Sequence, residues 1–160
     1  MRRLLVACAG LALMVLAGCG HRAPDEADVL NTEAKLPAGL PVPAMDWRVI
    51  SSSVDREYGT MATLTGNDVA WKYSGTGAYP EGSELALMTW LQRDDPHWFG
   101  ARVPGSFVAL ETVTMVRGAD GKLAAVYRRF AGEPLREVTD AASADARKAV
   151  LLEMRYSVMP

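Results

Sequence analysis

The sequence predicts an α+β fold, in which an antiparallel β-sheet of about five strands carries a short helix and a C-terminal helix. Two observations support this class. Between residues 45 and 135, short apolar or alternating runs are separated by turns that contain glycine and proline, as in strands joined by hairpins. After the last of these turns, apolar residues recur at helical spacing.

The globular domain is expected to begin near Met45 with two short strands. Residues 47–50 alternate polar and apolar side chains, which is typical of a half-buried strand. A loop leads to Gly59, and residues 60–65 repeat the alternation. These two ranges are therefore the first strands of the predicted sheet.

A short helix is expected after the second strand. Gly66 is followed by Asn67 and Asp68, and either of these polar residues can cap a helix that runs to Tyr73. The glycine-rich residues 74–77 follow the helix and lack the Lys-Ser/Thr pair of a phosphate-binding loop. They predict a loop and not a nucleotide site.

The next strand is expected at the centre of the sheet. Residues 79–82 (Tyr-Pro-Glu-Gly) are a turn signal, and residues 84–91 are apolar at nearly every position. A strand that is apolar on both faces is normally covered on both sides. Residues 94–100 then end it.

A β-hairpin and a final helix complete the predicted fold. Residues 106–116 and 122–130 read as strands joined by a turn at 117–121, where glycines can adopt positive φ. Pro134 ends the sheet-forming region, and Thr139 or Asp140 can cap the last helix. The expected buried stripe of that helix consists of Ala142, Ala146, Val150 and Met154.

The N-terminus has the parts of a secretory signal peptide. Arg2 and Arg3 precede an apolar run over residues 4–16, and small residues follow. The run is shorter than the roughly 20 apolar residues that a transmembrane helix needs. The order Leu16-Ala17-Gly18-Cys19 resembles the bacterial lipobox, whose cysteine thiol receives diacylglycerol and becomes the first residue after cleavage. The alternative is an ordinary signal peptide that contains a cysteine.

Acylation of Cys19 implies anchoring to the lipid bilayer of the cell envelope, since several acyl chains hold more firmly than one. Gly20 follows the cysteine, whereas aspartate there is the usual signal for retention in the inner membrane. If the host has two membranes, the expected location is the periplasmic face of the outer membrane.

The chain therefore divides into a signal peptide (1–18), a lipidated flexible tether (19–44) and a globular domain (45–160). The tether is expected because its prolines and acidic residues offer little to bury. These residues are Pro24, Asp25, Glu26, Asp28, Pro37, Pro41 and Pro43.

Charge and cysteine content exclude several functions. The formal net charge is −2, which argues against nucleic acid as a partner. Cys8 leaves with the signal peptide and Cys19 is expected to be lipidated. The domain then has no disulfide, no zinc-binding cysteines and no CxxCH haem-attachment motif, and its acidic residues lack the spacing of a calcium loop.

The order of motifs in residues 45–160 resembles the cytochrome P-460 family. The matching motifs are Trp47-Arg48, Gly66-Asn67-Asp68-Val69-Ala70, the turn at 79–82 and the apolar strand at 84–91. The resemblance implies a mainly antiparallel sheet and often a homodimer. In the founding members it also implies a c-type haem, bound through CxxCH near the C-terminus and linked to a lysine. Those members oxidise hydroxylamine, and relatives bind nitric oxide or other small gases.

This chain departs from the family where the haem chemistry lies. Residues 141–156 contain neither cysteine nor histidine, and no lysine lies between Lys72 and Lys122. Covalent haem is therefore excluded, while non-covalent haem stays open. Any imidazole ligand would have to be His97, the single histidine of residues 45–160.

His97 is the first candidate site residue. As a ligand or base it could be tuned by Asp94 or Asp95, with Trp98 and Phe99 as the walls of a pocket. Alternatively, it is a loop histidine bonded to a neighbouring group, with both aromatic rings folded into the core. A metal site would need more ligands, and no G-x-S-x-G motif presents a serine for a triad.

Aromatic side chains are the other candidates. Most of the four tryptophans should be core, but a subset could line a small-ligand cavity, and Tyr79, Trp90 and Trp98 are the candidates for this role. One of Arg128 and Arg129 should point inward, with Glu111 as its partner, unless both are solvated edge charges.

We expect a lipid-anchored envelope protein whose domain is a small-ligand binding or accessory module and not a catalyst. Two alternatives stay open. One is a haem-dependent redox or gas-binding protein with non-covalent haem held by His97. The other is a structural lipoprotein that docks an envelope protein through its sheet.

Overall fold

The computed structural model describes residues 30–139 and 141–157, and the compact unit discussed below begins at Asn31. The predicted signal peptide, the lipobox-like residues 16–19 and the predicted lipidation of Cys19 lie outside the described residues. None of the described helices is long and apolar enough to cross a bilayer.

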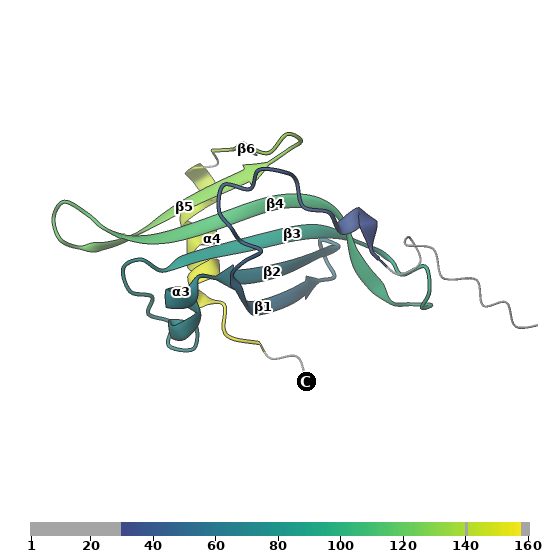
Figure 1. Ribbon diagram of the computed structural model, residues 1–160, viewed down its shortest axis with the longest axis horizontal. Coiled ribbons are helices and arrows are strands. Elements are labelled where there is room, and N and C mark those ends of the chain that lie inside the picture. The colour runs from purple at the N-terminus through teal and green to yellow at the C-terminus, as the bar shows by residue number, and fades with distance from the viewer. Residues whose placement is uncertain (1–29, 140, 158–160) are drawn as a thin grey trace, which may run out of the picture. The chain divides into compact units, whose positions relative to one another are not determined.

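Within the described residues, six strands form one antiparallel sheet in the order β1-β2-β3-β4-β5-β6, so each strand pairs with its neighbours in sequence (Figure 1). The elements in chain order are η1 (Thr32–Ala34), β1 (Arg48–Asp55), β2 (Thr60–Gly66), α3 (Asp68–Tyr73), β3 (Glu84–Asp94), β4 (Arg102–Arg117), β5 (Leu123–Ala131), β6 (Arg136–Glu137) and α4 (Ala141–Glu153). The predicted α+β class is confirmed. The sixth strand, β6, pairs with β5 after the turn at Pro134, where the sheet was expected to end.

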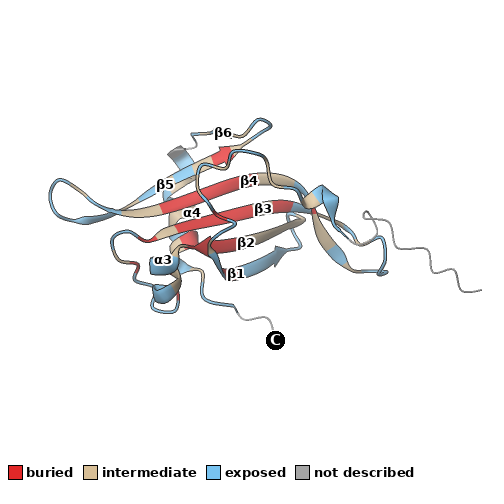
Figure 2. Cartoon of the chain, viewed as in Figure 1, coloured by how far each residue is buried: buried red, intermediate tan, exposed pale blue. Residues whose placement is uncertain are grey.

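The central position of β3 is also confirmed. Its side chains alternate between two buried clusters, with Leu85 and Leu87 on one face and Ala86, Met88 and Trp90 on the other. Figure 2 shows the buried residues as a band along β3 and β4. The strand is apolar on both faces because both faces of the sheet are covered.

On the first face, which we call the helix face, α4 packs across the strands. Leu151 of α4 is fully buried against a cluster that includes Leu64, Leu85, Leu87 and Val113. The expected stripe of α4 is wrong for Ala142, Ala146 and Val150, which are exposed, whereas Met154 packs against this cluster as expected. Alanines bury little area, so the helix instead turns Leu151 and Arg147 toward the sheet.

On the opposite face, residues 31–47 cross the sheet, and we call them the N-terminal segment. Ala44 is fully buried, and the indole N–H of Trp90 donates to the carbonyl oxygen of Ala34 at 3.2 Å. The segment also packs Leu36 and Val42 against the core. The globular unit therefore begins earlier than expected, and the predicted tether is wrong for residues 31–44. Its scattered apolar side chains find partners although they form no periodic pattern.

The helix α3 is capped by Asn67, one of the two expected residues. Its side-chain oxygen accepts a hydrogen bond from the N–H of Ala70 at 2.9 Å, and its amide donates to the carbonyl of Gly82 at 2.8 Å. Asn67 thereby holds α3 against the turn that precedes β3. Gly66 has no room for a side chain, because a Cβ there would lie 2.6 Å from Cδ1 of Ile50.

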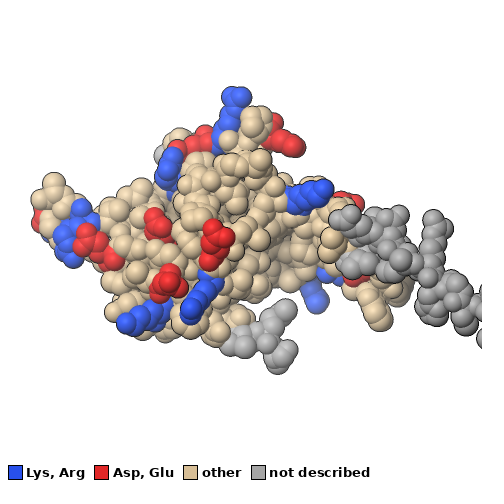
Figure 3. Space-filling view, in the orientation of Figure 1, with Lys and Arg blue, Asp and Glu red and all other residues tan. Residues whose placement is uncertain are grey.

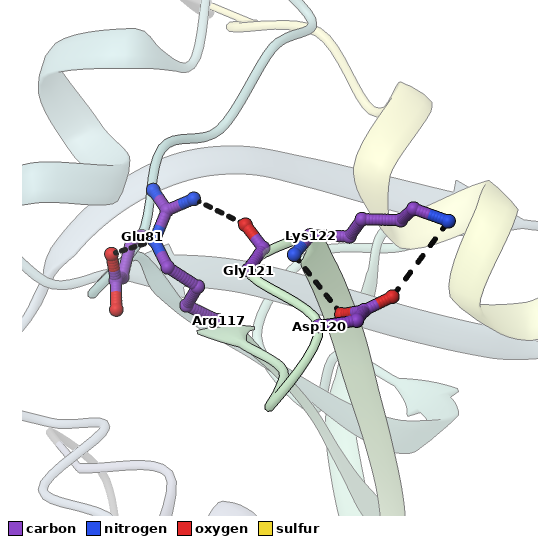
Figure 4. Close-up of polar contacts among 5 residues, drawn as sticks. All are labelled: Glu81, Arg117, Asp120, Gly121 and Lys122. Carbon is purple, nitrogen blue, oxygen red and sulfur yellow. Dashed lines mark hydrogen bonds and ion pairs between the residues drawn. The ribbon is translucent and has the colours of Figure 1, made fainter.

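The turn between β4 and β5 is held by charged side chains (Figure 4). Arg117 donates to Glu81 at 3.0 Å and to the carbonyl of Gly121 at 2.7 Å. Asp120 accepts from the backbone N–H of Lys122 at 3.0 Å, and Gly121 has a φ of 77°. The predicted hairpin turn is confirmed, and these contacts tie it to the turn before β3. On the face shown in Figure 3, charged side chains of both signs are interspersed.

The hairpin of β3 and β4 is longer than the sequence suggested. Pairing continues through Arg93 with Val103 and Asp94 with Arg102, so only residues 95–101 form the tip. The ladder can include charged residues such as Arg93, Asp94 and Arg102 here, because the hairpin extends beyond the buried band, where side chains meet water (Figure 2).

Candidate ligand-binding site

A buried carboxylate marks the candidate site. Glu111 lies near the middle of β4, opposite Leu87 on β3 and Arg129 on β5, and is only 4% exposed. An ionised carboxylate at such a position needs charged or hydrogen-bonding partners to offset the lost hydration.

Two side chains supply these partners. Arg147 of α4 donates from Nε to Oε1 of Glu111 at 2.8 Å and from Nη2 to Oε2 at 2.6 Å. The hydroxyl of Tyr127, on β5, donates to Oε1 at 2.5 Å. The bidentate pair joins the helix to the sheet with defined geometry.

These contacts fix the protonation states of the cluster. Burial raises the pKa of Glu111, but the hydrogen bonds from Arg147 and Tyr127 and the charges of Arg147 and Arg129 outweigh it, so this pKa lies below its ordinary value. Burial and the contact with Glu111 raise the pKa of Tyr127 far above its ordinary value. At neutral pH the carboxylate is therefore charged and the phenol is protonated.

Arg128 and Arg129 point to opposite faces, as alternation predicts. Arg128 donates twice to Glu137 of β6, at 3.0 and 2.6 Å, and its guanidinium lies 4.9 Å from the ring centroid of Phe130. Arg129 is half-buried on the helix face and faces Glu111 across the ladder. Within the described residues, Arg129 makes no side-chain hydrogen bond or ion pair. The prediction that Glu111 would face the inward arginine is confirmed, but its direct partner is Arg147.

A groove of about 540 Å³ opens beside this cluster, on the part of the helix face next to α4. It is lined by Asp55, Tyr58, Thr60, Thr89, Val108, Ala109, Glu111, Arg129, Ser143 and Arg147. The polar side chains of the lining are hydroxyls, two guanidinium groups and the carboxylates of Asp55 and Glu111, so the groove suits a small polar ligand.

A second, smaller groove of about 260 Å³ lies between the N-terminal segment and strands β1 to β3. Trp90, one of the predicted site residues, lines it together with Met88 and Trp47. The Trp90 ring also packs edge-on against Phe107, with centroids 5.9 Å apart. This groove is apolar and offers few hydrogen-bonding groups.

The structure does not bring the four predicted site residues together. Tyr79 is buried on the helix face, where burial raises its pKa and its hydroxyl has no hydrogen-bond partner within the described chain. Trp90 lies on the opposite face. His97 and Trp98 lie at the tip of the β3–β4 hairpin, where both are exposed. The expected packing of Trp98 and Phe99 in the core is wrong, because these side chains are 73% and 110% exposed.

These positions do not fit a haem. His97 lines neither groove. Its backbone N–H donates a hydrogen bond to the carboxylate of Asp95 at 2.8 Å. An axial ligand needs its imidazole to face a cavity wide enough for the macrocycle, and His97 instead faces solvent. Among the described residues, no group of three or more His, Cys, Asp or Glu side chains could hold a metal ion.

Sequence reasoning missed Arg147 and the groove. The available signal was that Arg147 lies four residues before Leu151, on the same side of a helix. A charged residue on the same helix face as a buried leucine either lies at the edge of the core, where it reaches solvent, or has a buried partner of opposite charge. Glu111, which has Ala109 and Val113 two residues away on either side along its strand, could have been recognised as that partner.

A scan against models of protein families gives no match for this chain, and a search of curated proteins finds none either.

Proposed function

We propose that this chain is a lipid-anchored cell-envelope protein whose globular unit binds a small polar ligand with an acidic group. Its anchor is the acylated Cys19, supported by the lipobox-like residues 16–19 behind the basic and apolar N-terminus. Because Gly20 follows the cysteine, the proposed location in a host with two membranes is the periplasmic face of the outer membrane. The proposed binding site is the groove beside α4.

The position of Arg129 is the observation from which we infer that the ligand has an acidic group. Arg129 lines the groove, yet Glu111, the nearest carboxylate across the ladder, already receives both hydrogen bonds of Arg147. The guanidinium of Arg129 therefore keeps its donors for a ligand. Arginine matches the oxygens of a carboxylate or phosphate with two parallel hydrogen bonds.

The protonation states favour binding over catalysis. A general base works best with a pKa near the operating pH, whereas the pKa of Glu111 is lowered and that of Tyr127 is raised. Both shifts move these groups away from neutral pH. We therefore propose a binding or accessory module.

The ligand proposal is tested by calorimetry and thermal unfolding of the purified chain with acetate, citrate and inorganic phosphate as separate probes. At least one probe should bind to and stabilise the wild type, and Arg129→Gln should abolish the effect. Arg128→Gln is the matched control, because it removes an identical charge from the neighbouring residue on the opposite face. Equal responses in the two variants, or no response in the wild type, would contradict the proposal.

The anchor is tested separately. Expression in a bacterial host with a labelled fatty acid should label the wild-type chain and not Cys19→Ser. The wild type should also fractionate with membranes, whereas the variant should appear in the soluble envelope fraction.

A homodimer, which the family resemblance implies, is a further proposal. Sedimentation of the detergent-solubilised chain distinguishes a dimer from a monomer. Haem binding through His97 has no support from the geometry around that residue. Addition of haem should therefore give no Soret shift that His97→Ala removes.

A further inference from the structure

The tip of the β3–β4 hairpin, residues 95–101, exposes two neighbouring aromatic side chains. Trp98 is 73% exposed and Phe99 is 110% exposed. Other large apolar side chains of this unit are exposed as well, among them Tyr58 at 74%, but Trp98 and Phe99 are two aromatic residues adjacent in sequence at a hairpin tip. Exposed aromatic side chains at a tip generally mark a surface that contacts something else.

The tip stands clear of the buried core. The last buried residue of β3 is Trp90, and three more pairs follow it along the ladder, from Gln92 with Pro104 to Asp94 with Arg102. In Figure 1 the paired strands continue past the ends of β1 and β2. A flat surface that approaches this end of the sheet would therefore meet Trp98 and Phe99 first.

The chain enters the globular unit at the same hairpin. The amide of Asn31 donates to the carbonyl of Pro104 at 2.6 Å, and its oxygen accepts from Arg93 at 2.9 Å. Arg93 also pairs with Glu33 of η1 at 3.3 Å. Three separate contacts thus fix the start of the unit to the base of the aromatic tip.

The link to the proposed lipid is short. The 12 residues from Gly20 to Asn31 span at most about 40 Å even when fully extended. A lipid on Cys19 would therefore keep the base of the hairpin within this distance of the bilayer. Two aromatic side chains alone bind a membrane weakly, but a tether raises their effective concentration at the surface.

We infer that the tip of the β3–β4 hairpin is a second membrane contact, which inserts Trp98 and Phe99 into the interfacial layer of the bilayer that holds Cys19. This rests on the proposed lipid anchor. The side chains of the tip suit a bilayer surface, because tryptophan is enriched at membrane–water interfaces, where its ring contacts apolar groups and its N–H is hydrated. Beside the tip, Asp94 is paired to Arg102 at 3.3 Å, and the tip itself carries the carboxylate of Asp95, so the proposed contact rests on the aromatic rings and not on attraction to anionic lipid.

The test uses the full lipidated chain in vesicles of phosphatidylethanolamine and phosphatidylglycerol, with and without brominated acyl chains that quench nearby indoles. Part of the tryptophan emission should be quenched, and Trp98→Phe should remove that quenched part. In the Trp98→Phe background, Tyr73→Trp supplies the control, since it places an exposed indole on α3 at the other end of the sheet. That indole should not be quenched.

The experiment distinguishes an error in the proposed hairpin contact from an error in the proposed lipid anchor. If the chain floats with the vesicles but Trp98 is not quenched, the hairpin contact is wrong while the anchor stands. If the lipidated chain does not float, the anchor is wrong, and the inference falls with it. Equal quenching of the indoles at positions 73 and 98 would overturn the proposed orientation. Shielding of Trp98 only in native membranes would assign the tip to a protein partner instead.

Discussion

Arg147 places two nitrogens of its guanidinium on the two carboxylate oxygens of Glu111, at 2.8 and 2.6 Å. The pair joins α4 to the centre of β4, and the Glu111 side chain is buried while the Arg147 side chain is 39% exposed. It therefore combines a structural link with one wall of the candidate groove. The consequences of this relationship can be measured.

Removing one member of the pair should cost more than removing both. Arg147→Met leaves the buried carboxylate of Glu111 without its main partner, so we expect a loss of about 2–4 kcal/mol in the free energy of unfolding. The double variant Glu111→Leu/Arg147→Met keeps the volume without the charges and should recover much of this loss. Urea unfolding of the single and double variants measures the coupling. Additive effects would show that the two residues act independently.

The stability should depend on pH through Glu111. Its pKa is below the ordinary value of 4.5 in the folded chain, so its ionisation stabilises the fold above about pH 4.5 and this contribution is lost as the pH falls through the folded pKa. Unfolding measured between pH 2 and 7 should therefore show a decline on the acid side. Glu111→Gln removes the titrating group and should make the profile flatter there. An unchanged acid slope in this variant would assign the decline to other carboxylates.

A side chain at Gly66 should destabilise the fold, because the neighbouring core residues would have to shift. A Cβ at this position would lie 2.6 Å from Cδ1 of Ile50 and 3.0 Å from Cβ of Ala70, so Gly66→Ala should cost about 1–3 kcal/mol by overpacking. Gly75→Ala is the matched control, because a Cβ at Gly75 has no neighbour within 4 Å and its φ is not positive. Thermal unfolding should separate the two variants clearly. Similar midpoints would mean that the core relaxes around residue 66.

The N-terminal segment should be required for a stable unit. A chain that begins at residue 45 lacks Ala44 and Leu36, which pack against the core beside Trp90 and Phe107. We expect it to bind a hydrophobic dye and to unfold at a lower temperature than a chain that begins at residue 31. Identical melting of the two chains would indicate that the segment adds no stability.

Much of the fold follows from patterns that a single sequence displays. The two-sided apolar run of β3 and the glycine turn after Arg117 predict a central strand and a hairpin, and the sheet contains both. The N-terminal segment could not be predicted in this way, because its prolines and isolated apolar residues match neither strand nor helix periodicity. Its packing depends on the surface offered by strands far away in sequence.

The candidate site was harder to predict. His97 and Trp98 were singled out for their chemistry, but a loop residue reveals nothing in the sequence about which way it faces. Arg147 was missed because the rotation of α4 is decided by the burial of Leu151 in the cluster on the helix face and by the hydrogen bonds of Arg147 to Glu111, and not by the alanines that mark its repeat. The pairing of Glu111 on β4 with Arg147 on α4, 36 residues later, is a tertiary contact that no local sequence pattern indicates.

The attachment of Asn31 to Arg93 and Pro104 also has a mechanical consequence. A force applied to the chain from its N-terminal side would act on these contacts before it acts on the hydrogen bonds between the strands. If they gave way, the N-terminal segment would peel from its face and uncover Met88 and Trp90, while the hydrogen bonds between the strands stayed intact. The domain could thus yield in stages under tension, with the sheet as the part that resists longest.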